Sequence, residues 1–179
     1  MKYISIDNTG KVTGIYARKQ KSFETIAYEG EVEIGWRYDA ESGKVNKPAL
    51  QGGMTLSEYK NKRVQDVNAL CYSKIVAGFN SSALGSSHRY DSAEIDQFNA
   101  LANLTIARDN QINVKHKCTE ISTGVTEFKE HTPAQILQVF TEGGAHVSAL
   151  LQRKNVIENQ IKAATDFTEV DAVDINSGW

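Results

Sequence analysis

Histidine and cysteine are the side chains in this 179-residue sequence best suited to metal or nucleophilic chemistry. No two histidines stand four residues apart, as they would on a metal-binding helix face, and none has a cysteine or carboxylate at ligand spacing. The sequence therefore predicts no metal site and no cofactor, and we expect the histidines to be solvated or singly hydrogen-bonded. They are His88, His116, His131 and His146.

His116 and Cys118 form the pair with a nucleophilic alternative. Two residues apart on a strand, they point the same way and would bring a thiol near an imidazole. Glu120 is the acid available on that face, and neither residue begins a helix. In a reducing compartment a buried free thiol is the usual state, so we expect Cys71 and Cys118 to be packing residues. An enzyme that uses Cys118 and His116 is the weaker alternative.

Motifs for binding phosphate or for acyl transfer are missing from the sequence. It has no GxGxxG, no P-loop and no GxSxG, and the Gly-Lys pairs at residues 10 and 43 are typical of hairpin turns. The acidic residues between Asp166 and Asp174 lack the spacing and central glycine of a calcium loop, and we expect a solvated helix face. The sequence thus predicts no catalytic residue and favours a non-enzymatic binding or assembly protein.

The composition is that of an ordinary globular chain, with 40% hydrophobic and 23% charged residues. Twenty basic and 22 acidic side chains give a net charge of −2, which argues against a nucleic-acid partner held by phosphate contacts. No apolar run approaches the roughly 18 residues of a membrane span, and polar residues interrupt the N-terminus too early for a signal peptide. We therefore expect no membrane partner and a location in the cytoplasm.

Residues 1–50 predict a small β-module. Alternating apolar residues between 3 and 15 flank a turn at Gly10, and residues 34–38 and 44–45 form a second pair of strands that Pro48 ends. Two hairpins make a module of marginal stability, which we expect to be stabilised by contact with a partner. Trp36 and Tyr38 are predicted either as exposed partner-binding aromatics or as a small core with Ile34 and Val45.

Residues 46–53 are expected to be a linker, and residues 54–179 a mainly helical domain. A Thr55–Glu58 capping signature begins one helix, which Gly78 ends, and residues 80–90 read as a loop anchored by Tyr90. Strands are predicted over 114–121 and 125–129, as a hairpin with one exposed face. A second helix begins near Asp91. Its apolar stripe consists of Ile95, Phe98, Leu101, Ala102 and Ile106.

A long helix begins at Thr132–Pro133 and is followed by a short one over residues 168–173. The Gly143–Gly144 pair predicts a kink, a break or the close approach of another backbone. The helix is either a core helix or a seam shared between chains, so Phe140, Val147 and Leu150 are candidate partner-binding residues. Its apolar positions follow a heptad-like spacing. They are Phe140, Gly143, Val147, Leu150, Lys154, Ile157, Ile161 and Ala164.

Together these elements predict an α+β fold: a small N-terminal β-hairpin module, then a mainly helical domain with an inserted β-hairpin and a long C-terminal helix. Residues 34–39 with Gly43-Lys44-Val45 resemble the β-module that opens many phage tail-associated proteins. The loop at residues 87–91 and the ending Asp174-Ile175-Asn176-Ser177-Gly178-Trp179 resemble a phage domain of unknown function that occurs in tail-fibre assembly and minor tail proteins.

The resemblance implies a protein that binds a phage tail fibre or another tail protein. It would act as a chaperone-like assembly factor in the host cytoplasm, or alternatively remain in the virion tail as a permanent structural subunit that attaches the fibre. A homo-oligomer is compatible with both.

Overall fold

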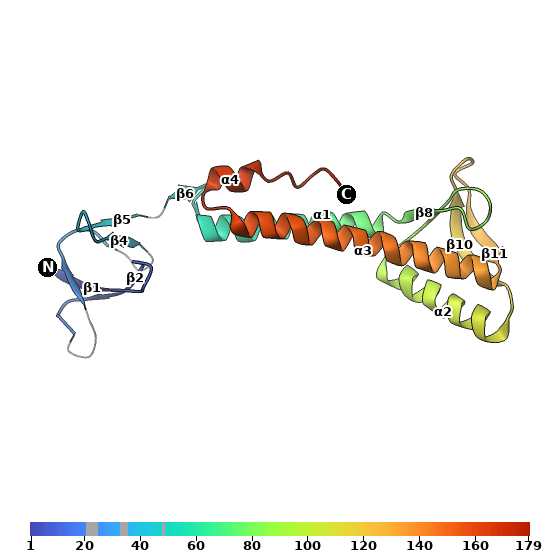
Figure 1. The fold of residues 1–179 in the computed structure, drawn as a ribbon, viewed down its shortest axis with the longest axis horizontal. Coiled ribbons are helices and arrows are strands. Elements are labelled where there is room, and N and C mark those ends of the chain that lie inside the picture. Colours follow the sequence, from blue (N-terminus) through green and yellow to red (C-terminus); the bar gives the residue numbers. More distant parts are fainter. Residues whose placement is uncertain (21–24, 33–35, 48) are drawn as a thin grey trace. The chain divides into compact units, whose positions relative to one another are not determined.

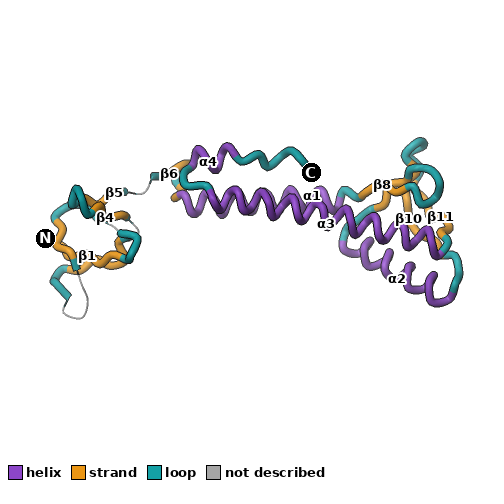
Figure 2. The backbone as a smooth tube through the Cα atoms, in the orientation of Figure 1, coloured by secondary structure: helices purple, strands orange, loops and turns teal. Residues whose placement is uncertain are grey.

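The computed structural model describes residues 1–20, 25–32, 36–47 and 49–179. Helices and strands are mixed along the chain, so the predicted α+β class is confirmed (Figures 1 and 2). The chain divides into two compact units, residues 1–59 and 60–179. The domain limits expected from the sequence, 1–50 and 54–179, remain a prediction.

The first unit is built from short antiparallel strands. β1 lies between β2 and β3, and β4 pairs with β5, so both predicted hairpins are present, while the strand β3 was not predicted. Gly10 takes a φ of 80° in the turn after β1, where Asp7 accepts hydrogen bonds from the next residues. The strands are β1 (Lys2–Ile6), β2 (Val12–Tyr16), β3 (Ile26–Tyr28), β4 (Arg37–Asp39) and β5 (Lys44–Asn46).

The core of the first unit is small. Ile4, Val12 and Val32 are buried, and half-buried side chains pack around them. Trp36 and Tyr38 are half-buried in this surrounding layer together with Val45, as the core alternative expects, and their role in partner binding stays a prediction. The predicted contribution of Ile34 and the stop at Pro48 lie outside the described residues. Few large side chains are available for this core because strands β1–β5 are only three to five residues long.

The predicted linker at residues 46–53 contains regular structure. β6 (Leu50–Gln51) and β7 (Met54–Thr55) pair across a turn in which Gly52 and Gly53 have φ angles of 57° and 79°. Two consecutive residues with positive φ form the tight hairpin turn for which glycine is suited. The expected linker is therefore corrected to a short hairpin.

The first helix, α1 (Leu56–Val76), begins as predicted. The Glu58 carboxylate accepts hydrogen bonds from the backbone N–H and the hydroxyl of Thr55, at 2.8 and 2.7 Å. The helix ends before Gly78, whose φ of 84° and close approach to the Tyr90 carbonyl leave no space for a side chain.

Within the second unit, α1 lies antiparallel to α3 (Pro133–Ala163). Lys60 donates to the Lys162 carbonyl at 2.9 Å, and the Cys71 thiol lies 3.7 Å from the Leu150 carbonyl. The heptad-like face of α3 is the face that the fold buries, so the core-helix alternative is the one observed. α3 runs through Gly143–Gly144 without interruption, and α4 (Phe167–Ala172) then packs on it.

A four-stranded antiparallel sheet forms the other end of this unit, in the order β11-β10-β9-β8. The loop predicted over residues 80–90 is corrected, because its two ends form β8 and β9. The sheet extends the predicted hairpin, which has one buried and one exposed face along β10. The strands are β8 (Phe79–Ser81), β9 (His88–Tyr90), β10 (Val114–Glu120) and β11 (Thr126–His131).

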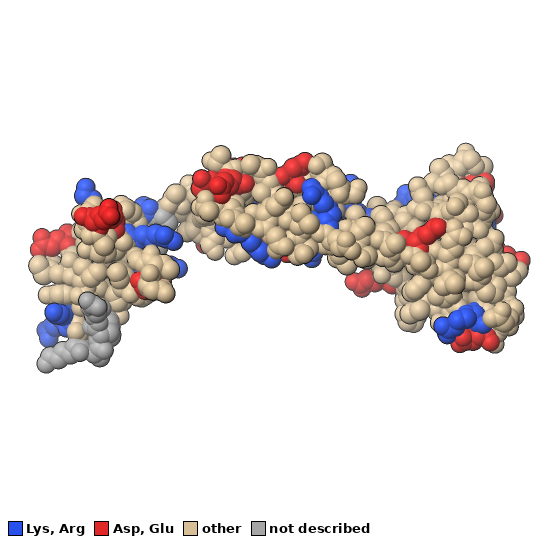
Figure 3. All heavy atoms as spheres, in the orientation of Figure 1, with Lys and Arg blue, Asp and Glu red and all other residues tan. Residues whose placement is uncertain are grey.

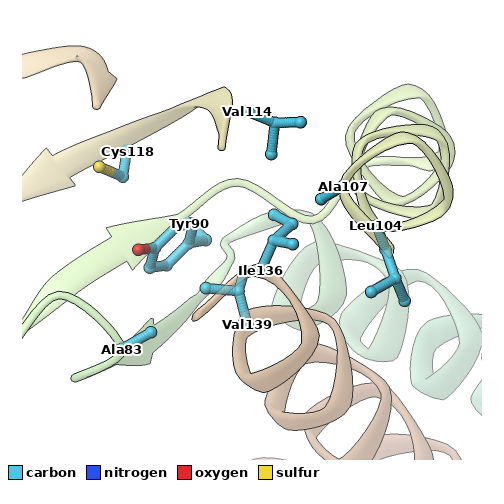
Figure 4. Close-up of a cluster of buried hydrophobic side chains, with 8 residues drawn as sticks. All are labelled: Ala83, Tyr90, Leu104, Ala107, Val114, Cys118, Ile136 and Val139. Carbon is cyan, nitrogen blue, oxygen red and sulfur yellow. The ribbon is translucent and has the colours of Figure 1, made fainter. Parts of the chain in front are cut away.

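α3 packs on this sheet, and α2 (Glu94–Asn110) packs against α3 and β10. The core side chains between them surround Tyr90 (Figure 4). α2 contributes Leu104 and Ala107 to this core, but not the stripe predicted from its sequence, which lies largely exposed. The core cluster consists of Ala83, Tyr90, Leu104, Ala107, Val114, Cys118, Ile136 and Val139.

Each of the two units carries charges of both signs on the face shown in Figure 3. Among the described residues, no helix combines the length and apolar character needed to cross a membrane.

Candidate functional site

A pocket of about 170 Å³ lies between α2, α3 and the sheet, and we call it the α2–α3 pocket. Most of the pocket lining is apolar. Its polar side chains come from α2, from the segment that precedes α2, and from β10. The apolar lining includes Phe79, Val139, Phe140 and Val147, and the polar lining includes Asp91, Ser92, Asp96, Gln97 and His116.

The glycine pair of α3 shapes this pocket. A Cβ at Gly143 would lie 2.8 Å from the ring of Phe79, so the missing side chain lets the ring pack against the helix. Gly144 also lines the pocket, and a Cβ there would meet no described atom within 4 Å. The predicted close approach of another backbone is corrected to that of an aromatic ring at Gly143, and the helix does not break at this pair.

Tyr90 forms part of the pocket wall and the centre of an aromatic cluster. Its ring stacks on Phe79 at 5.7 Å and on His116 at 5.9 Å between centroids. Its hydroxyl lies 2.9 Å from His131 Nε2, while His131 Nδ1 lies 2.9 Å from the Lys129 carbonyl. A carbonyl only accepts, so Nδ1 of neutral His131 carries the proton and Tyr90 donates to Nε2.

Of the two states expected for the histidines, solvated or singly hydrogen-bonded, the second describes His88 and His116, whose Nδ1 atoms pair with the Ser86 carbonyl and the Asn103 amide. His88, His116 and His131 are at most 8% exposed, and strands distant in sequence bring them together. Burial lowers the pKa of His116, and the nearby His131 lowers it further; burial also lowers the pKa of His131. Both rings are therefore neutral at pH 7 and serve as aromatic packing groups with hydrogen-bonding edges.

Cys118 lies in the same core and differs from an activated nucleophile. Burial raises the pKa of its thiol, and burial also raises the pKa of the neighbouring Tyr90 hydroxyl. A reactive cysteine requires a populated thiolate, which an apolar surrounding disfavours. Both Cys118 and Cys71 are buried free thiols, as expected for packing residues.

In the part of the chain that the structure describes, no three His, Cys, Asp or Glu side chains are grouped so that they could hold a metal ion. The Nε2 atoms of His88 and His146 are buried there without a hydrogen-bond partner, and the His146 ring lies 6.1 Å from the Phe79 ring between centroids.

The residues predicted to bind a partner fall in separate places. Phe140 and Val147 are half-buried and line the α2–α3 pocket, whereas Leu150 is buried outside its lining, where its carbonyl lies beside Cys71 of α1. Trp36 and Tyr38 lie in the first unit, where Lys47 Nζ stands 5.7 Å from the Trp36 ring centroid.

Sequence reasoning missed the rest of the pocket lining. Phe79 lay between the predicted helix stop at Gly78 and the loop expected over residues 80–90, and Asp96 belonged to no predicted motif. Asp96 accepts a hydrogen bond from the Ala93 backbone at the start of α2, and the neighbouring Asp91 pairs with Lys117 at 2.8 Å. The glycine pair was the available signal, since glycine inside a long apolar helix marks close packing.

Residues 58–176 match the model of a family described as a domain of unknown function, DUF4376. The chain belongs to this family. The matched residues of the DUF4376 domain include the whole α2–α3 pocket and the histidine–tyrosine cluster beneath it. Neither a curated protein nor a solved structure matches the chain.

Proposed function

We propose that this chain is a non-enzymatic protein of a phage tail, which binds a tail fibre and assists its assembly or attachment. The α2–α3 pocket is the observation that carries the proposal, because it is the size of one side chain. Small-molecule sites usually occupy about 300–1,000 Å³, whereas this pocket holds about 170 Å³. Its occupant would be an apolar or aromatic side chain of the fibre.

The lining supports such an occupant. Phe79, Phe140 and Val147 provide apolar walls, and an anchor residue in a desolvated pocket dominates the affinity of many protein interfaces. Asp91 is already paired with Lys117, and Asp96 is engaged by the Ala93 N–H, so neither carboxylate requires a cation from the partner.

The identity of the partner rests on the sequence resemblance to phage tail-associated proteins. The small first unit supports it as well, since a marginal β-module gains stability from a bound partner. Binding would then occur in the host cytoplasm while the tail is assembled.

Capture of the co-expressed tail fibre tests this proposal. Gly144→Trp places an indole at the pocket lining and should abolish capture, whereas Ala145→Trp adds the same group one residue further along α3, outside the pocket lining. Equal capture by both variants would count against the pocket. Unchanged fibre solubility with and without the wild-type chain would count against assistance in assembly.

The alternative role, a permanent subunit of the tail, predicts a stoichiometric amount of this chain in purified virions. Mass spectrometry of the particles distinguishes the two roles, because an assembly factor would be absent from them. For the weaker enzymatic alternative, Cys118→Ala is the test: full function in that variant removes a thiol mechanism.

A further inference from the structure

α2 turns its most apolar face away from the core of its own domain. Ile95, Phe98, Leu101 and Ile106 are 63, 66, 47 and 47% exposed. Leu104, which packs in the core, lies roughly 180° around the helix from Ile95. Ile106 and Phe98 are likewise turned away from Leu104, by about 160° and 120°, and Leu101 lies at the edge of the exposed face, about 60° from Leu104.

Such a face is unusual for a surface that contacts only water. Scattered apolar residues on surfaces are normal, but a contiguous row along three turns of helix marks an interaction site. Phe128 of β11, 68% exposed, extends the row sideways, because it lines a groove beside α2 together with Asn99 and Ala102.

We propose that α2 of a second copy of this chain covers this face in an antiparallel helix pair. The row is close to self-complementary about Leu101. An antiparallel copy places Ile95 of one chain opposite Ile106 of the other at both ends, with Phe98 and Leu101 between them. A two-fold interface requires this kind of self-matching surface.

The charged residues beside the apolar row favour an antiparallel helix pair over a parallel one. Glu94 and Arg108 flank the row on the same side of the helix, each seven residues from Leu101. An antiparallel pair sets Glu94 of each copy beside Arg108 of the other, whereas a parallel pair sets like charges together. Arg108 already contacts its neighbour Asp109 at 2.8 Å, but both groups are exposed and this pair alone contributes little.

This inference does not depend on the proposed function, because fibre capture is assigned to the pocket beside α3 and dimerisation to the opposite side of α2. Sedimentation velocity of the full chain at micromolar concentrations should give twice the mass of one chain. Phe98→Asp should give the single-chain mass. Tyr72→Asp, which changes an exposed aromatic residue of α1, should leave the dimer intact.

A charge exchange keeps the test decisive if Phe98→Asp disturbs folding. Glu94→Arg and Arg108→Glu should each weaken the dimer, and the double variant should restore it, with circular dichroism confirming the helix content. A chain that is monomeric at every concentration, a dimer that survives Phe98→Asp, or a double variant that stays as weak as the single ones would overturn the proposal.

Discussion

Adjacent glycines in α3 have opposite surroundings and should respond oppositely to the same substitution. Gly144→Ala places a methyl group in open space and should raise the free energy of unfolding by up to about 1 kcal/mol through helix propensity. Gly143→Ala drives a methyl group into the Phe79 ring, which is held by stacking on Tyr90. Overpacking costs about 1–3 kcal/mol, so we expect a net loss.

Urea unfolding of the two variants and the wild type measures both changes. We expect the free energy of unfolding to rise in Gly144→Ala and to fall in Gly143→Ala. Equal stabilisation by both alanines would mean that the Phe79 ring moves aside freely and that Gly143 has no packing role.

Acid should destabilise the second unit through its neutral histidines. Burial lowers the pKa of His116 and of His131 below the ordinary value of 6.5, so the unfolded chain binds protons that the folded chain does not. Stability contributed by the neutral rings is complete above pH 6.5 and falls as the pH decreases toward the folded-state pKa values. The slope approaches about 1.4 kcal/mol per pH unit for each proton.

Chemical unfolding at several pH values between 5 and 8 checks this dependence. Stability that stays constant from pH 6.5 to 5 would contradict the neutral, buried state of both rings. His146→Gln serves as a control, because His146 is only half-buried and lies outside the His116–His131 pair.

At the scale of elements, the first turn of α3 is stabilised by the side chains of Thr132 and Gln135. Thr132 Oγ1 accepts from the Gln135 N–H, and the Gln135 side chain accepts from the Thr132 N–H. Thr132→Ala should lower the free energy of unfolding by about 1 kcal/mol. Thr141→Ala, in the exposed interior of the same helix, should cause no comparable loss. Similar losses for both variants in thermal unfolding would argue against the cap.

The long elements of this fold were predictable because their ends carry local signals. The Thr55–Glu58 pair, Gly78 and the Thr132–Pro133 start each act through hydrogen bonds or φ angles within a few residues, so sequence alone places them. The alternation of β10 predicted its buried and exposed faces in the same way. Short strands such as β8 and β9 have only three residues and therefore no period to recognise.

Local sequence signals do not predict which face of a helix the fold buries. Periodicity identified the stripe at Ile95 and Phe98, but it does not specify what covers that stripe, and here the domain leaves it exposed. The α2–α3 pocket likewise depends on Phe79 and His116 arriving from different strands. Proximity of this kind is fixed by strand pairing and helix packing over the whole unit, not by local spacing.

On the scale of the whole molecule, the two compact units should differ in stability. Among its described residues the first has three buried hydrophobic side chains at its core, while the second packs long helices on a four-stranded sheet. Backbone amides in β1 and β2 should therefore exchange with solvent faster than those in the middle of α1 and α3. Hydrogen exchange measured by mass spectrometry would contradict this if both units showed equal protection.

The pairing of α1 with α3 has a consequence for synthesis on the ribosome. Lys60 meets Lys162 across 102 residues of chain, so the apolar face of α1 lacks its α3 partner until those residues have been made. Loops of this length close slowly, and an uncovered apolar helix is open to aggregation in the meantime. Ribosome-bound chains that end before residue 140 should consequently lack the protected α1 of the folded protein, so folding of this unit has to wait for synthesis of α3.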